Sequence, residues 1–114
     1  MSEASREGGI EFMQDGSACF RGPLTFETVP GLFRDLEERV KREAPVECID
    51  LAKVTASDSA ALALLLEWQA RARADGRELA VRNAPGGLLR LARLCEAVDL
   101  LNLTGREAAG SAQR

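Results

Sequence analysis

The fold is decided by one stretch of the sequence, IDLAKVTASDSAALALLL (residues 49–66). It starts within a short apolar segment, Val46–Leu51, whose β-branched residues and partial alternation predict a central strand. A polar turn is expected at Thr55–Ser59. An apolar helix should then run to about Ala74, with Gly76 just past its end as a stop. The stretch therefore predicts a strand, a tight polar loop and a helix in direct succession.

Three polar residues, Ser57, Asp58 and Ser59, lie at the predicted start of this helix. Open α/β sheets commonly place functional sites at the carboxyl end of a strand, and a helix start adds unpaired N–H groups and partial positive charge. Ser57 or Asp58 could simply cap the helix, with Thr55 and Asp58 as a capping-box variant. Ser59 lies one position inside the helix, where capping does not require it.

The helix also has an unusually wide apolar surface. One stripe consists of Leu62, Leu65, Leu66 and Gln69, and a second stripe beside it consists of Ala61, Leu64, Trp68 and Ala72. A single core-facing stripe is usually narrower. Leu62 and Trp68 are therefore candidate partner contacts, since Trp is a frequent interface anchor. The alternative is that Trp68 closes the core.

Apolar spacing and turn residues predict the other elements. Asp15-Gly16 predicts a hairpin with a primed turn, and Gly22-Pro23 should end its second strand. Thr28 is expected to cap the first helix, with Pro30 in the first turn. The remaining predicted strands are Ile10–Gln14, Ser17–Arg21 and Glu78–Val81. The remaining predicted helices run from Val29 to before Pro45 and over Leu88–Ala97. Val98–Leu103 is expected to be either a short strand or an irregular return.

The resulting order is β-β-α-β-α-β-α with a possible final short strand, which predicts an α/β fold with a mixed sheet and flanking helices. The length of 114 residues suits one domain. We expect that domain at residues 10–104, between flexible polar tails at 1–9 and 105–114.

Composition excludes several classes of function. The net charge of −3 argues against nucleic-acid binding, which needs a strongly basic surface. Six arginines at positions 71–93 form either a solvated helix face or a docking surface for an acidic partner. No apolar run is long enough to span a membrane, and no signal peptide is evident. The expected location is the cytoplasm, with any membrane association made through a partner.

Catalysis, metal and cofactors are not expected. The chain has no histidine and no tyrosine, and it lacks the nucleophile-elbow, Walker and dinucleotide-binding motifs. The three cysteines, Cys19, Cys48 and Cys95, are far apart in sequence and show no zinc-ligand spacing. They are expected to be free, buried thiols in a reducing compartment.

The segment from Ile49-Asp50-Leu51 to Asp58-Ser59-Ala60-Ala61-Leu62 resembles STAS domains, the fold of anti-sigma factor antagonists and sulfate-transporter tails. In that family a strand ending in Asp-Leu precedes an Asp-Ser or Asp-Thr pair at a helix start. The hydroxyl of that pair is phosphorylated or contacts a partner, and by position it is Ser59, with Asp58 before it. The entry at residues 22–30, GPLTFETVP, and the length of a lone domain resemble the MlaB-type branch.

The MlaB-type resemblance implies a non-catalytic cytoplasmic subunit. Such a subunit binds the ATPase of a phospholipid-transport ABC complex, and through it a membrane permease, in the system that maintains outer-membrane lipid asymmetry. The alternative is an anti-sigma factor antagonist switched by phosphorylation of Ser59. Many STAS domains have one or two glycines after the hydroxyl residue, but this chain has Ala60 and Ala61. Added methyl groups would hinder the close approach of a kinase, which favours constitutive docking.

Overall fold

The computed structural model describes residues 8–42 and 44–105, so most of both predicted tails lies outside the described residues. The order of elements is the predicted one, and the final short strand is present. The strands are β1 (Gly9–Phe12), β2 (Ser17–Leu24), β3 (Cys48–Ser57), β4 (Ala80–Ala84) and β5 (Leu103–Gly105). The helices are α2 (Val29–Arg42), α3 (Ser59–Ala74) and α4 (Gly86–Leu94).

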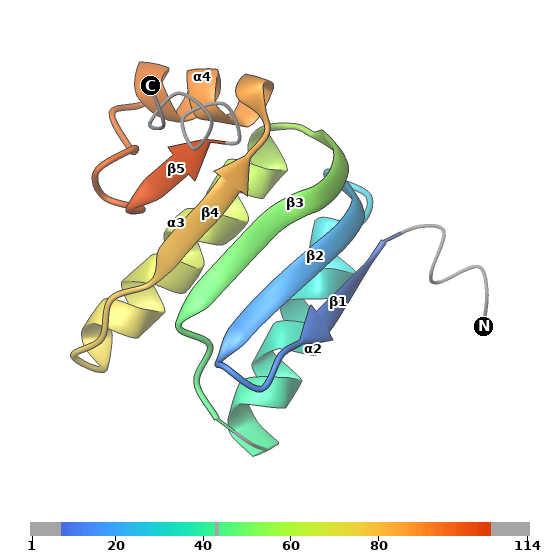
Figure 1. Ribbon diagram of the computed structural model, residues 1–114, viewed down its shortest axis with the longest axis vertical. Helices are drawn as coiled ribbons and strands as arrows, with labels where there is room; N and C mark the ends of the chain where they lie inside the picture. The colour runs from blue at the N-terminus through green and yellow to red at the C-terminus, as the bar shows by residue number, and fades with distance from the viewer. Residues whose placement is uncertain (1–7, 43, 106–114) are drawn as a thin grey trace.

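The strands form one mixed sheet in the order β1-β2-β3-β4-β5. β1 and β2 are antiparallel, whereas the other three pairs are parallel. Helices α2 and α3 pack behind the sheet, and α4 lies near the carboxyl end of β4 (Figure 1). The predicted α/β class with a mixed sheet and flanking helices is confirmed.

The hairpin forms at the predicted place, but its turn differs from the prediction. The Met13 N–H donates to the Ser17 carbonyl over 2.9 Å, and of the Asp15-Gly16 pair only Gly16 has a positive φ, at 91°. A primed turn on this pair would need a positive φ at Asp15, its first central residue. The Asp15 carboxylate accepts hydrogen bonds from both the N–H and the hydroxyl of Ser17, which lower its pKa. This side-chain turn makes a primed turn unnecessary.

Strands β2 and β3 are longer than predicted, and this positions the candidate site. β2 continues through Gly22-Pro23 to Leu24, past two irregularities in its register with β3. β3 continues to Ser57, which pairs with Leu24, so most of the expected polar turn at Thr55–Ser59 is strand. The longer pairing brings the β2–α2 loop beside the start of α3.

Thr28 precedes α2 as predicted, but its hydroxyl does not act as the expected cap. It accepts a hydrogen bond from the Thr25 N–H over 3.0 Å and donates one to the Pro23 carbonyl over 2.8 Å. The side chain therefore ties together the loop before the helix. At the other end, α2 stops at Arg42, before Pro45 as expected.

The end of α3 is confirmed, whereas the following boundaries shift by a few residues. Gly76 has a φ of 76°, and its N–H donates to the Arg73 carbonyl just past the end of α3. β4 starts two residues later than predicted and ends at Ala84, and α4 then covers Gly86–Leu94 instead of Leu88–Ala97. Of the two alternatives for Val98–Leu103, the irregular return is the observed one over residues 98–102, and the short strand β5 starts only at Leu103.

The core lies between the sheet and the helices. Its largest fully buried apolar side chains are Phe20, Leu24, Leu36, Ile49, Leu51, Leu65, Leu79, Val81, Leu88 and Leu101. Two polar residues are also buried, Ser17 of β2 at 6% and Gln69 of α3 at 2% exposure. The Gln69 amide donates to the carbonyls of Leu79 and Leu100 and accepts from the Leu79 N–H, each over 2.9 Å. Gln69 thereby joins α3 to the residue just before β4 and to the return before β5.

Candidate functional site

Asp58 is the N-cap of α3 and also bonds a second loop. Its backbone is extended, and its Oδ1 accepts from the Ala60 N–H over 2.9 Å. Its Oδ2 accepts from the Phe26 N–H over 3.1 Å, and its own N–H donates to the Leu24 carbonyl over 3.4 Å. One carboxylate therefore satisfies a free donor of the helix start and fixes the β2–α2 loop beside it.

The structure separates the roles of the neighbouring hydroxyl residues. Thr55 lies within β3, so the proposed capping box from Thr55 to Asp58 is not formed. Ser57 is the half-buried last residue of β3, and Asp58 is the cap. Ser59 is the first residue of α3 and is exposed, at the partly positive end of the helix.

Leu62 and Trp68 lie in the core with 5% and 6% exposure. The Trp68 indole packs edge-on against the Phe33 ring of α2, with ring centroids 5.3 Å apart. Seven of the eight residues in the two stripes of α3 are buried, and Leu66 is partly buried. The sheet lies on one side of the helix (Figure 1), and α2 and α4 pack against other sides. This burial corrects the expectation that Leu62 and Trp68 face a partner and favours the alternative in which Trp68 closes the core.

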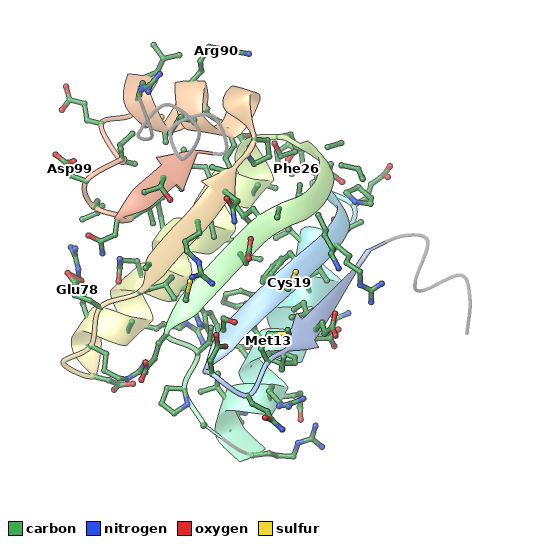
Figure 2. The ribbon with its side chains drawn as sticks, viewed as in Figure 1. Met13, Cys19, Phe26, Glu78, Arg90 and Asp99 are labelled. Atoms are coloured by element: carbon green, nitrogen blue, oxygen red, sulfur yellow. The ribbon has the colours of Figure 1, made fainter. Side chains whose placement is uncertain are left out.

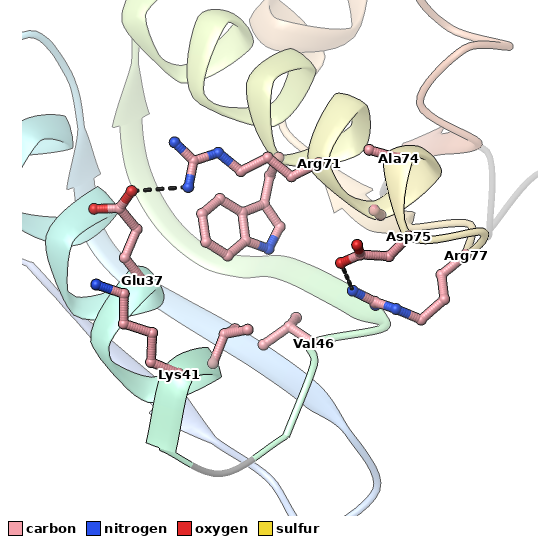
Figure 3. Close-up of a pocket in the computed structure, with 10 residues that line it drawn as sticks. Glu37, Lys41, Val46, Arg71, Ala74, Asp75 and Arg77 are labelled. Atoms are coloured by element: carbon pink, nitrogen blue, oxygen red, sulfur yellow. Dashed lines mark hydrogen bonds and ion pairs between the residues drawn. The ribbon is translucent and has the colours of Figure 1, made fainter.

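A cleft of about 410 Å³ lies at the opposite end of α3, between its last turns and α2 (Figure 3). Arg71 lies over the Phe33 and Trp68 rings, with its guanidinium carbon 4.8 and 5.3 Å from their centroids. Its guanidinium also donates to Glu37 over 2.8 Å and to Glu67 over 3.2 Å. The hydrogen bonds to Glu37 and Glu67 raise the pKa of Arg71, and the bond to Glu37 contributes most.

Four of the arginines at positions 71–93 form ion pairs within the domain. Arg71, Arg73 and Arg77 have carboxylate partners at 2.8–3.3 Å, and Arg82 lies 4.0 Å from Asp50 on the sheet. These pairs favour a solvated face over a docking surface for an acidic partner.

A comparison with protein-family models matches residues 20–103 to the family described as Mlab, STAS domain. The matched region contains both the β2–α2 loop and the start of α3. The chain belongs to this family.

Solved structures of similar fold agree with that assignment. A putative anti-sigma factor antagonist from Thermotoga maritima superimposes with a TM-score of 0.70 at 14% identity, covering 98% of this chain and 99% of the other. The unphosphorylated anti-sigma factor antagonist SpoIIAA gives a TM-score of 0.61 at 13% identity, covering 75% and 81%. At such identities the likeness establishes the STAS fold alone. No match was found among curated proteins.

Within this STAS domain the three cysteines are free, as expected, but they are less buried than expected. Cys19 and Cys48 are half-buried and Cys95 is exposed. Partial burial raises the pKa of the Cys19 and Cys48 thiols, which disfavours the reactive thiolate form.

The described residues contain no cluster of acidic or cysteine side chains suited to a metal, and none of their helices could cross a membrane. STAS domains are generally non-catalytic.

Phe26 is a candidate site residue that the sequence pattern did not predict. Within residues 22–30 the sequence predicted local structural roles for Gly22-Pro23, Thr28 and Pro30, but no site residue. In the structure Phe26 is 67% exposed, and its N–H bonds Asp58 at the α3 start. The available signal was a large apolar residue between polar neighbours, Thr25 and Glu27, in a short loop, but its proximity to Asp58 depends on strand pairing distant in sequence.

Proposed function

We propose that this STAS domain is a non-catalytic cytoplasmic subunit that binds the ATPase of a phospholipid-transport ABC complex. Through that ATPase it would associate with the membrane permease at the inner membrane and serve outer-membrane lipid asymmetry. The observation that carries the proposal is the exposed Ser59 at a helix start capped by Asp58, in a chain of the Mlab STAS family. Binding would either stabilise or regulate the ATPase.

The surroundings of Ser59 favour docking over chemistry. Ala60 and Ala61, which follow it, are 7% and 0% exposed, so the helix presents the short serine side chain alone at this point. The Asp58 carboxylate holds the adjoining backbone in place through two hydrogen bonds. A fixed surface loses little conformational freedom on association, which suits a stable subunit contact.

The proposal is tested by placing the same bulky charge at either end of α3. Ser59→Arg is expected to weaken binding to the purified ATPase subunit about 100-fold, or about 2.7 kcal/mol, because the long side chain separates the surfaces. Ala74→Arg is the matched control, since Ala74 is the exposed last residue of α3. It should bind within about twofold of the unaltered chain. Isothermal titration calorimetry measures both.

Folding is checked separately by thermal unfolding. Arginine at the helix start opposes the helix dipole by roughly 0.3–1 kcal/mol, whereas arginine at the end is favourable. Ser59→Arg should therefore unfold only a few degrees lower. If the folded Ser59→Arg variant binds the ATPase as the unaltered chain does, the interface lies elsewhere.

The second candidate is an anti-sigma factor antagonist switched by phosphorylation of Ser59. It is favoured by the exposure of Ser59 and by the two solved structures of similar fold, which are an anti-sigma factor antagonist and a putative one. Incubation with cell extract and ATP, followed by mass spectrometry, distinguishes the two. Stoichiometric phosphate on Ser59, lost in Ser59→Ala, would support the switch. An unmodified chain that binds the ATPase would support the subunit.

A further inference from the structure

Phe26 is an aromatic residue that is exposed to solvent. Four large apolar side chains of the described residues are exposed, and they are Met13, Phe26, Leu94 and Leu100. Phe26 is the aromatic one among them, and it is 67% exposed. Figure 2 shows Phe26 and Met13 at opposite ends of the sheet, with Phe26 at the end where α3 begins. An exposed aromatic ring gains most from burial in a partner.

The loop that presents Phe26 is fixed on both sides. The Phe26 N–H is bound by Asp58, and Thr28 bonds both Thr25 and Pro23 through its hydroxyl. The N–H groups of Thr28 and Val29 also donate to the Thr25 carbonyl, over 3.0 and 2.8 Å. The exposure of the ring therefore results from a closed hydrogen-bonded turn. A side chain presented in this way is pre-organised for binding.

Phe26 and Ser59 belong to one surface. The two oxygens of Asp58 accept from the N–H groups of Phe26 and Ala60, so a single carboxylate spans the distance between the loop and the first turn of α3. We call residues 25–28 and 57–59 the α3-start surface. This surface includes two carboxylates, Glu27 and Asp58, and no basic residue.

From this placement we propose that Phe26 is the aromatic anchor of the α3-start surface, inserting into an apolar pocket of the ATPase that is bordered by lysine or arginine. The basic border follows from charge complementarity with Glu27 and Asp58. The inference rests on the proposed function, because it names a residue and a recognition chemistry for the same interface. Ser59 then lies beside the anchor, where a small side chain allows close approach.

The test compares two exposed apolar residues. Phe26→Ala keeps the backbone N–H that Asp58 binds, so the loop should persist and thermal unfolding should stay within about 2 °C of the unaltered chain. Binding to the purified ATPase subunit should weaken about 30-fold, as for an interface hot spot. Leu94→Ala is the control, because Leu94 is 82% exposed at the far end of α4 and should bind within about twofold.

The charge component is tested with Glu27→Gln. Removing one exposed carboxylate should slow association and flatten its dependence on salt, while Phe26→Ala should mainly speed dissociation. Phe26→Trp should restore most of the affinity.

Failure of the anchor and failure of the proposed function give different results. If the unaltered chain binds the ATPase and Phe26→Ala binds within twofold of it, the anchor is overturned and the subunit function stands. If the unaltered chain shows no binding to the ATPase, both are overturned.

Discussion

The two ends of helix α3 differ in how far the side chains there are already covered or bonded by other residues of the domain. At the carboxyl end, the Trp68 ring is buried, and Arg71 covers it while bonding Glu37 and Glu67. At the amino end, the backbone groups are bonded by Asp58, but Phe26 and Ser59 project into solvent. Both ends have an aromatic residue near charged groups, yet at the amino end alone the ring is uncovered.

This difference shows why a cleft is not by itself a binding site. The cleft at the carboxyl end has a volume of about 410 Å³, but Arg71 and Arg77 on its rim are paired with Glu37 and Asp75 (Figure 3). A ligand there would have to compete with those pairs. At the amino end, the exposed ring of Phe26 and the Ser59 hydroxyl would lose only water on binding.

The largest effect on stability is expected from Trp68→Ala. Removing this buried ring should lower the free energy of unfolding by about 3–5 kcal/mol, because a cavity forms beside Phe33. Urea denaturation followed by circular dichroism measures it. The protein that remains folded should bind the ATPase normally, since Trp68 belongs to the other end of α3. A loss below about 1 kcal/mol would contradict the core role of Trp68.

A smaller effect is expected at the amino end from Asp58→Ala. It removes the acceptor for the Ala60 and Phe26 N–H groups and should cost about 1 kcal/mol of stability, as N-cap replacements do. Because the Phe26 loop is released, ATPase binding should also weaken about tenfold.

Asp58→Asn separates these two roles. Asparagine caps helices as well as aspartate, but its side chain has one acceptor oxygen where aspartate has two. Stability should therefore stay within about 0.5 kcal/mol, while ATPase binding still falls as the Phe26 bond is lost. If Asp58→Asn binds like the unaltered chain, the hydrogen bond between the loops does not position the interface.

The last effect, expected on stability alone, is that of Arg71→Ala at the carboxyl end of α3. Its side chain is 45% exposed, so its two ion pairs and its contacts with aromatic rings should together contribute about 1 kcal/mol. Arg71→Lys is the matched control and should recover less than half of the loss, because lysine lacks the planar group that stacks and bonds two carboxylates. Chemical denaturation at low and high salt measures both. Equal stability of all three proteins would show that these pairs contribute nothing.

The sequence alone gave much of the fold and part of the site. The helical spacing of apolar residues in α2 and α3 is local, and the stop at Gly76 depends on a backbone conformation that glycine favours. Ser57 and Asp58 could both be predicted as cap candidates, because capping also depends on residues close together in sequence. The extension of β3 to Ser57 could not be predicted, because it depends on pairing with β2 more than thirty residues earlier.

Local sequence thus determined which elements form, their order, and that a polar residue pair begins the central helix. Periodicity and capping involve residues within a few positions of one another, so they can be identified along the chain. The tertiary structure alone decided that Trp68 is buried, that Gln69 bonds two distant carbonyls, and that Phe26 lies beside Asp58. Each of these depends on segments distant in sequence, which meet only when the sheet and helices pack together.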